Sequence, residues 1–158
     1  MNIKNESIEQ KLTDLGLNLP LSGSKKLPFA SGVIFDNLVY LSGQTALVNG
    51  EMKYTGTVGS TVTLEEAEEA AKICVLNLLT ALKGLIGDLD KVKRVVKLNG
   101  YVASEKTFTQ QPQVINAASR LLNDIFGEEN LHARVAIGCA SLPGGTPVEI
   151  ELIVEIDN

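Results

Sequence analysis

The sequence contains little of what metal sites and disulfide frameworks are built from. It has one histidine and two cysteines in 158 residues. Cys74 and Cys139 lie far apart, form no CxxC pattern and sit among apolar residues, where a free thiol packs as a small hydrophobic group. We therefore expect buried, reduced thiols and no metal site.

Long hydrophobic runs are absent too. No stretch of about 18 consecutive apolar residues occurs that could cross a membrane. The opening residues, MNIKNESIEQ, hold no apolar segment of the kind found in secretory signals. These absences predict a cytoplasmic protein with no membrane partner.

The chain has fewer basic than acidic residues, 14 against 19. The formal net charge is −5 and the pI is near 4.9, whereas nucleic-acid affinity comes largely from Lys and Arg that neutralise phosphates. The clearest basic cluster is Lys91, Lys93, Arg94 and Lys97. Its spacing is typical of the solvated side of a strand, with a nucleic-acid patch as the alternative. We expect no nucleic-acid partner.

The rest of the composition is that of an ordinary globular protein. Hydrophobic residues make up 44% of the chain and charged residues 21%, without a repetitive tract. A chain of this length fits one domain with one core.

Helical signals occur in the first, middle and later parts of the chain. A Ser-x-x-Gln capping box predicts a short helix over residues 7–15. A Thr-x-x-Glu box at Thr63 and a sustained apolar stripe predict a long helix that ends by Gly87. A further helix is expected to begin with Thr109 as its cap, with Pro112 in its first turn, and to end before Gly127.

Strand signals fill the stretches between the helices. Residues 45–62 are expected to be irregular, with a small strand near 52–54. The main predicted strands are residues 29–35, 38–42, 92–103, 133–140 and 148–156. Asp36-Asn37 supports a hairpin turn, and the loop 141–147 suits a wide hairpin. Val96 shares the apolar parity of Leu98 in the long strand. The predicted order is α-ββ(β)-α-β-α-β-β.

Arg134 stands at the head of a strip of very small residues. On strand parity this strip is Arg134, Ala136, Gly138 and Ala140, and the opposite side carries Val135, Ile137 and Cys139. Such a strip can admit another subunit, a ligand or a closely packed helix. A guanidinium grips a carboxylate through two parallel hydrogen bonds, so Arg134 is a candidate substrate clamp. The alternative is a structural ion pair with a glutamate of the neighbouring strand.

Glu149 and Glu151 share one face of the last strand, where a solvated rim is the simplest interpretation. If 133–140 and 148–156 paired as a hairpin, Arg134 and Glu149 would lie about four residues, or roughly 13 Å, apart. A joint site would then need an irregular register or a second subunit. The apolar character of both faces of residues 133–140 also favours oligomerisation.

Several motifs, in this order along the chain, resemble the RidA family, also called YjgF or endoribonuclease L-PSP. They are LPFASGV (27–33), VYLSGQ (39–44), INAA (115–118), HARVAIG (132–138) and LPGGTPVEIELIVEI (142–156). The resemblance implies a two-layer α+β fold of the chorismate-mutase-like type, with a mixed sheet packed on two helices. It also implies a homotrimer with ligand sites in the clefts between subunits. Residues 1–20 are then an N-terminal extension with a short helix, and 21–158 form a single domain.

The resemblance also implies an activity and its residues. Family members with enamine/imine deaminase activity hydrolyse 2-imino acids to 2-keto acids and ammonia without a cofactor. Arg134 matches their carboxylate clamp, and Glu149 matches the acid proposed to hold or activate water. The expected partner is therefore a small carboxylate, a 2-imino or 2-keto acid.

Other matched positions would line the pocket. Ser42 and Gly43 would border the substrate, with the Gly43 N–H available to it, and Asn116 would lie at the cleft edge. The chain departs from the deaminase pattern at Phe29, where a tyrosine is frequent, and at Ala136, where a cysteine is frequent. A hydroxyl and a thiol are therefore missing, although the clamp and the acid are present.

Two other classes of function remain open. One is a non-enzymatic trimer that binds small carboxylates, which the departures at Phe29 and Ala136 allow. The other is RNA cleavage of the endoribonuclease L-PSP type. The acidic charge and the single histidine, His132, argue against RNA cleavage, because it normally uses acid/base pairs near pH 7 and a basic track.

Overall fold

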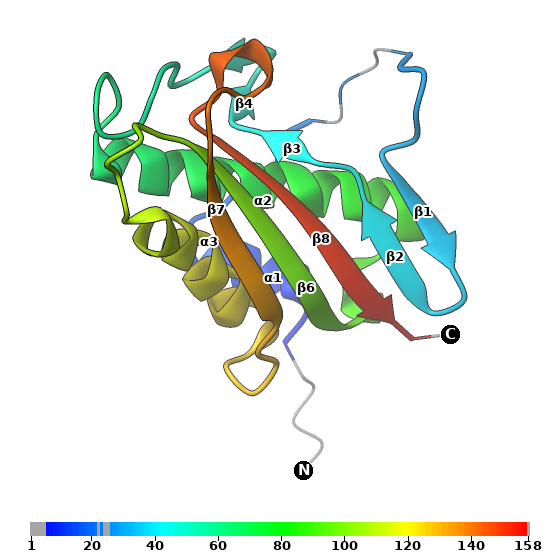
Figure 1. The fold of residues 1–158 in the computed structure, drawn as a ribbon. Coiled ribbons are helices and arrows are strands. Elements are labelled where there is room, and N and C mark those ends of the chain that lie inside the picture. The colour runs from blue at the N-terminus through cyan, green and yellow to red at the C-terminus, as the bar shows by residue number, and fades with distance from the viewer. Residues whose placement is uncertain (1–5, 22, 24–25, 158) are drawn as a thin grey trace.

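A mixed β-sheet is covered by helices on one face and left open on the other (Figure 1). The computed structural model describes residues 6–21, 23 and 26–157. Its helices are α1 (Ile8–Asp14), α2 (Leu64–Ile86) and α3 (Gln111–Phe126), with short 3₁₀ turns η1 (Leu89–Lys91) and η2 (Pro143–Gly145). Its strands are β1 (Gly32–Phe35), β2 (Leu38–Leu41), β3 (Gln44–Thr45), β4 (Leu47–Val48), β5 (Glu51–Met52), β6 (Val92–Ala103), β7 (Ala133–Cys139) and β8 (Val148–Ile156). The predicted α+β class is confirmed. The predicted order of elements is confirmed from α2 onward, whereas five described strands, three of them only two residues long, precede α2 in place of the two or three expected.

The long helix α2 begins and ends where its sequence signals predict. Thr63 Oγ1 accepts a hydrogen bond from the N–H of Glu66, and the Glu66 carboxylate accepts one from the N–H of Thr63. Gly87, at φ 83°, ends the helix in a conformation that favours glycine. The predicted cap of α3 is wrong by one residue: Gln110 is the N-cap, so Thr109 lies outside the position from which a side chain could cap the helix.

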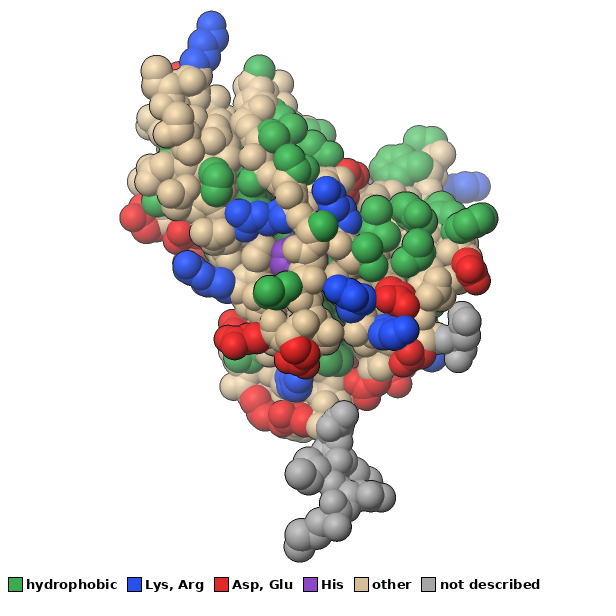
Figure 2. Space-filling model, turned by 60° about the horizontal axis from the view of Figure 1, so that its bottom comes forward, with side chains coloured by type: hydrophobic (Ala, Val, Ile, Leu, Met, Phe, Trp, Pro, Cys, Tyr) green, Lys and Arg blue, Asp and Glu red, His purple; other side chains and the backbone are tan. Residues whose placement is uncertain are grey.

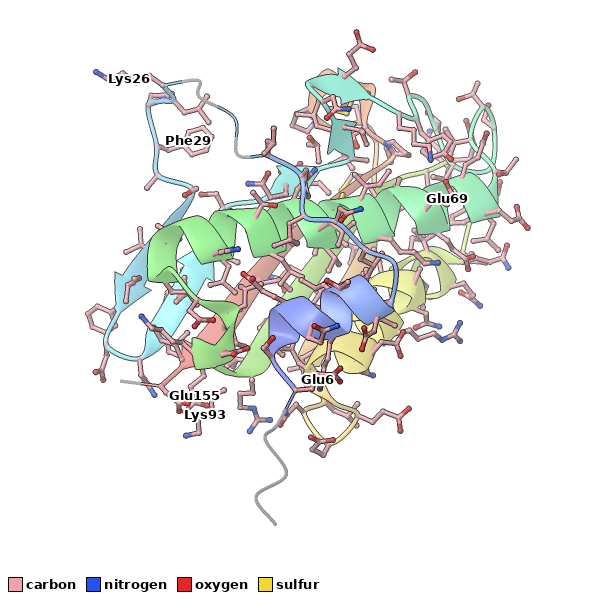
Figure 3. All side chains as sticks on the ribbon, turned by 180° about the vertical axis from the view of Figure 1, so that it is seen from behind. Glu6, Lys26, Phe29, Glu69, Lys93 and Glu155 are labelled. Atoms are coloured by element: carbon pink, nitrogen blue, oxygen red, sulfur yellow. The ribbon has the colours of Figure 1, made fainter. Side chains whose placement is uncertain are left out.

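The N-terminal helix α1 is part of the packed core. Ser7 Oγ accepts a hydrogen bond from the N–H of Gln10, as the capping signal predicts. Leu12 is only 4% exposed, and the N–H of Ile8 donates to Asp90 Oδ1 at 2.7 Å. Since α1 packs beside α3, it helps to cover the helical side of the molecule (Figure 3).

The sheet order is β1-β2-β8-β6-β7, with β3 beside β8. Among the described strands, β6 and β7 form the one parallel pair. The expected hairpin between 133–140 and 148–156 is therefore wrong, because β6 lies between these strands. The helix α3 carries the chain from β6 back to a parallel β7, and the loop 141–147 then passes to the far side of β6.

The first hairpin differs from expectation at its open end, where β2 also ends at Leu41 rather than residue 42. Asp36 and Asn37 form the predicted turn, with Phe35 opposite Leu38. The strand begins at Gly32 rather than residue 29, and one further bond of the same register, from the N–H of Ser42 to the carbonyl of Ser31, lies just before it. The small predicted strand near 52–54 is found as the β4–β5 hairpin, slightly earlier in the chain.

The two faces of the sheet have different environments. Leu98, Val102, Ile150 and Leu152 are buried toward the helices. The parity predicted for β6 fails in its first half, because register shifts between Val92 and Lys97 bury Val95 rather than Val96.

The other face of the sheet, which we call the open face, is not covered by any layer of the described part of the chain. Its exposed apolar side chains, each between 38% and 72% exposed, are Val33, Phe35, Tyr40, Val135 and Ile137. Figure 2 shows hydrophobic side chains gathered in separate groups with charged side chains between them. Cys139 also lies on this face and is half-buried, whereas Cys74 is buried as predicted; both thiols are free.

Among the described residues, no helix has both the length and the apolar character needed to span a membrane.

Candidate functional site

Arg134 turns toward the helices and is held by α3. It lies beside Leu98 in the parallel β6–β7 register and so shares the buried face of the sheet. Its Nη1 donates to Asn116 Oδ1 at 2.7 Å and to Ser119 Oγ at 3.2 Å. The structure thus brings together two predicted site residues, Arg134 and Asn116, and adds Ser119. Ala136, on the same face of β7, packs against the core.

The guanidinium has no carboxylate partner among the residues that the structure describes. Among the described residues, the ion pairs are Lys53–Glu69, Lys83–Glu9 and Lys93–Glu155. The structural ion pair considered for Arg134 is therefore wrong. All its hydrogen bonds to described residues come from Nη1, so Nε and Nη2, which form one edge of the planar group, remain available. A half-buried cation with one edge available suits an incoming carboxylate.

His132 adjoins this group. Its Nε2 lies 2.9 Å from Ser119 Oγ, while Nδ1 is buried without a partner among the described residues. Burial lowers the pKa of His132, and the nearby Arg134 charge lowers it further. Ser119 is absent from the predicted site, although its position three residues after Asn116 is the helical spacing that places two side chains together.

Glu149 lies on the open face, on the other side of the sheet from Arg134. Its register partners are Thr45 on β3 and Tyr101 on β6. Gly43 lies directly against it: a Cβ at Gly43 would overlap Glu149 Oε1 and lie 3.2 Å from the carboxyl carbon. Only a residue without a side chain leaves the Glu149 carboxylate in this place, so the structure joins two further predicted site residues.

Ser42 and Phe29 border this second group. The Ser42 hydroxyl donates to the carbonyl of Ala30 at 2.7 Å, so its proton is engaged. The Gly43 N–H, by contrast, has no partner among the described residues. Phe29, 60% exposed, lies on the loop ahead of β1, next to the residue that Ser42 binds (Figure 3).

The carboxylates on β8 have unequal surroundings. Glu151 accepts hydrogen bonds from Asn99 Nδ2 at 2.8 Å and from Tyr101 Oη at 2.9 Å. Glu149 accepts none from the described residues, and its pKa is raised, first by burial and then by the charge of Glu151. The expectation that positive charge keeps Glu149 ionised is thus not met within one chain.

The two groups are well separated in a single chain. We call Arg134, Asn116, Ser119 and His132 the arginine group, and Ser42, Gly43 and Glu149 the glutamate group. Across β6, Arg134 is level with Leu152, three residues from Glu149. The backbones are two strand spacings apart, roughly 10 Å, and three residues add roughly 10 Å more. Because the groups also face opposite sides of the sheet, one chain cannot present both to one small ligand.

Known proteins resemble this chain over nearly its whole length. Residues 9–156 match the model of a family described as "YjgF/chorismate mutase-like, putative endoribonuclease". The protein TCP17 of Trypanosoma cruzi is 39% identical over 152 residues, covering 96% of this chain and 95% of that protein.

Solved structures share the fold. The protein Atu1372 of Agrobacterium tumefaciens is 45% identical, with a TM-score of 0.87 and coverage of 95% of this chain and 92% of the other. A structure from Shewanella oneidensis described as "a putative endoribonuclease" is 26% identical, with a TM-score of 0.90 and coverage of 96% of this chain and 100% of the other.

Proposed function

This chain belongs to the YjgF/chorismate mutase-like family, and on that premise we propose that it is a cofactor-free hydrolase of small 2-imino acids. Its products are the 2-keto acid and ammonia. We also propose that it works as a homotrimer whose ligand sites lie between subunits. The observation that carries the proposal is the separation of the arginine and glutamate groups, each of which holds half of what this reaction needs.

Trimer formation would join the two halves. The strand β7, which supports Arg134, is an edge strand with one free side. The exposed apolar side chains of the open face need cover, and a second copy of this chain is the partner that a closed ring supplies. In such a ring each contact is head-to-tail, so the arginine group of one subunit meets the glutamate group of the next.

The chemistry follows from the groups that are free. Nε and Nη2 of Arg134 bind the substrate carboxylate as a fork, because Asn116 and Ser119 already hold Nη1. The Gly43 N–H orients the substrate. Glu149 takes a proton from water as the oxygen adds to the C=N carbon, and then returns it to the nitrogen. These steps give a carbinolamine. Glu149 then moves the hydroxyl proton of the carbinolamine to the nitrogen as the C–N bond breaks, so that the C=O bond of the 2-keto acid forms and ammonia leaves.

The surroundings of Glu149 favour hydrolysis over simple carboxylate binding. A carboxylate without hydrogen-bond donors and with a raised pKa is a better proton acceptor than a solvated one. RNA cleavage has less support, since the net charge is −5 and the lowered pKa of His132 reduces the acid form needed by a leaving group.

A coupled reaction tests the proposed activity. Purified protein added to an amino-acid dehydratase reaction should accelerate release of ammonia and 2-keto acid above the uncatalysed rate, equally with and without a chelator. The dehydratase alone and the Glu149→Gln variant are the controls. Saturable carboxylate binding with no acceleration would support the non-enzymatic alternative, and tight, salt-sensitive RNA binding would support a nuclease.

A substitution at Gly43 tests the role of Glu149 in the same assay. In Gly43→Ala the added methyl displaces the Glu149 carboxylate, so kcat/KM should fall about 100-fold. The backbone at Gly43 has no left-handed φ, so the melting temperature should change little. Gly84→Ala, in open space on α2, is the matched control and should retain full activity. An active Gly43→Ala variant would remove Glu149 from the site.

A further inference from the structure

A polar cluster on the open face lies outside the residues used so far. It consists of Asn99 and Tyr101 on β6 and Glu151 on β8. Both donors bind the same oxygen, Oε1 of Glu151, at 2.8 and 2.9 Å. Glu151 is two residues from Glu149 on the same face of the strand, and Tyr101 is the register partner of Glu149. The cluster therefore fixes a second carboxylate beside the one in the glutamate group.

We propose that Glu151, held by Asn99 and Tyr101, is a positioning residue that makes Glu149 the carboxylate that accepts the proton of the attacking water. The inference deepens the proposed function and rests on it. Glu151 touches no reacting atom in this scheme. The charge of Glu151 acts on Glu149, and the hydrogen bonds from Asn99 and Tyr101 hold the Glu151 carboxylate in a fixed position.

The division of roles follows from the hydrogen bonds. Two donors stabilise the charged form of Glu151, whereas Glu149 has no such donor and is half-buried. Burial and the lack of a donor make a carboxylate a better proton acceptor, which favours Glu149 for that role. The raised pKa of Glu149, caused by burial and then by Glu151, agrees with this assignment.

The groups that face Glu149 leave Glu151 as its principal charged neighbour. The titratable ones on the open face are Glu151 on its own strand and Tyr101 on β6. Cys74, on α2 at the opposite face of the sheet, has a thiol pKa raised by burial and then by the charge of Glu149. Gly43 and Thr45 on the other side carry no charge. Tyr101 has a pKa raised above its usual value, so it remains a neutral donor at neutral pH.

The pH profile of kcat/KM tests the assignment. If Glu149 is the base, its protonation causes the fall of kcat/KM at low pH, which is the acid limb of the profile. Glu151→Gln removes the neighbouring charge but keeps the shape, so the acid limb should move to lower pH and kcat at neutral pH should fall about tenfold. Tyr101→Phe removes one donor and should lower kcat several-fold with KM nearly unchanged.

Glu155→Gln is the matched control. Glu155 lies on the same strand and face but is paired with Lys93 at 3.0 Å, at the far end of β8 (Figure 3). Its replacement removes the same charge and should leave the pH profile unchanged. A shift equal to that of Glu151→Gln would mean a general charge effect and would overturn the inference.

A direct titration separates this inference from the proposed activity. The ¹³C carboxyl signal of Glu149, identified by its loss in Glu149→Gln, is followed against pH in the parent and in Glu151→Gln. Its midpoint should be lower in Glu151→Gln, whether or not the protein hydrolyses imines. The same midpoint in both proteins would overturn the inference, whereas a shifted midpoint without hydrolysis would overturn only the proposed function.

Discussion

Arg134→Ala is expected to abolish 2-keto acid release while the protein stays folded. The variant removes the cation that the proposed mechanism assigns to the substrate carboxylate, and no other described residue near it replaces that cation. Its structural cost is the loss of hydrogen bonds to Asn116 and Ser119 in a half-buried place, about 1–2 kcal/mol in all. For a chain of this size that lowers the melting temperature by about 2–8 °C.

Arg134→Lys separates charge from geometry. Lysine keeps the positive charge but lacks the planar fork, so it can hold either Asn116 or the substrate and not both in the same arrangement. We expect kcat/KM to fall about 100-fold, chiefly through a higher KM for the carboxylate substrate. The melting temperature should lie between those of the parent and Arg134→Ala.

Arg120→Ala is the control for both variants. Arg120 is an exposed arginine on α3, one residue after Ser119, and it makes no hydrogen bond with the described residues. Its loss changes the net charge equally and should leave turnover intact. Unchanged turnover of Arg134→Ala together with a large fall in its melting temperature would mean that Arg134 has a structural role. The proposed hydrolase would then lose its central residue.

The elements of this fold could be predicted because their signals are local. A capping box at Thr63, a glycine at position 87 and an apolar helical stripe fix α2 within a few neighbouring residues. The order of the strands could not be predicted, since nothing in the sequence of 141–147 indicates whether β8 pairs with β7 or with the other side of β6. The bulged half of β6 was missed for the same reason, because its register is set by β8, far away in the sequence.

The candidate site could likewise be predicted only where its signals are local in the sequence. Arg134, Asn116, Gly43 and Glu149 could be named from the sequence because their motifs carry a family resemblance. The need for glycine at position 43 became clear only when β8 placed Glu149 against it. The donors to Glu151 come from β6, about fifty residues away in the chain, and no local pattern in the sequence connects them.

Mixing two inactive variants should restore activity if each site spans two subunits. Arg134→Ala chains keep the glutamate group, and Glu149→Gln chains keep the arginine group. In a head-to-tail ring of three, any trimer that contains both chains has one site in which both groups are intact. With random assembly of equal amounts, about one quarter of all sites should therefore work. Each variant alone should be inactive.

The parent mixed with the double variant Arg134→Ala/Glu149→Gln makes the matched comparison. A site within one chain would keep about half of the parental activity, and a shared site only about one quarter. Both mixtures are prepared by joint unfolding and refolding, and native mass spectrometry should show trimers near three times 16.9 kDa with all subunit combinations. Mixed trimers that stay inactive would place the arginine and glutamate groups in separate sites. A mass near that of one chain would contradict the shared site outright, because the groups on opposite faces of one sheet would then have no second subunit to bring them together.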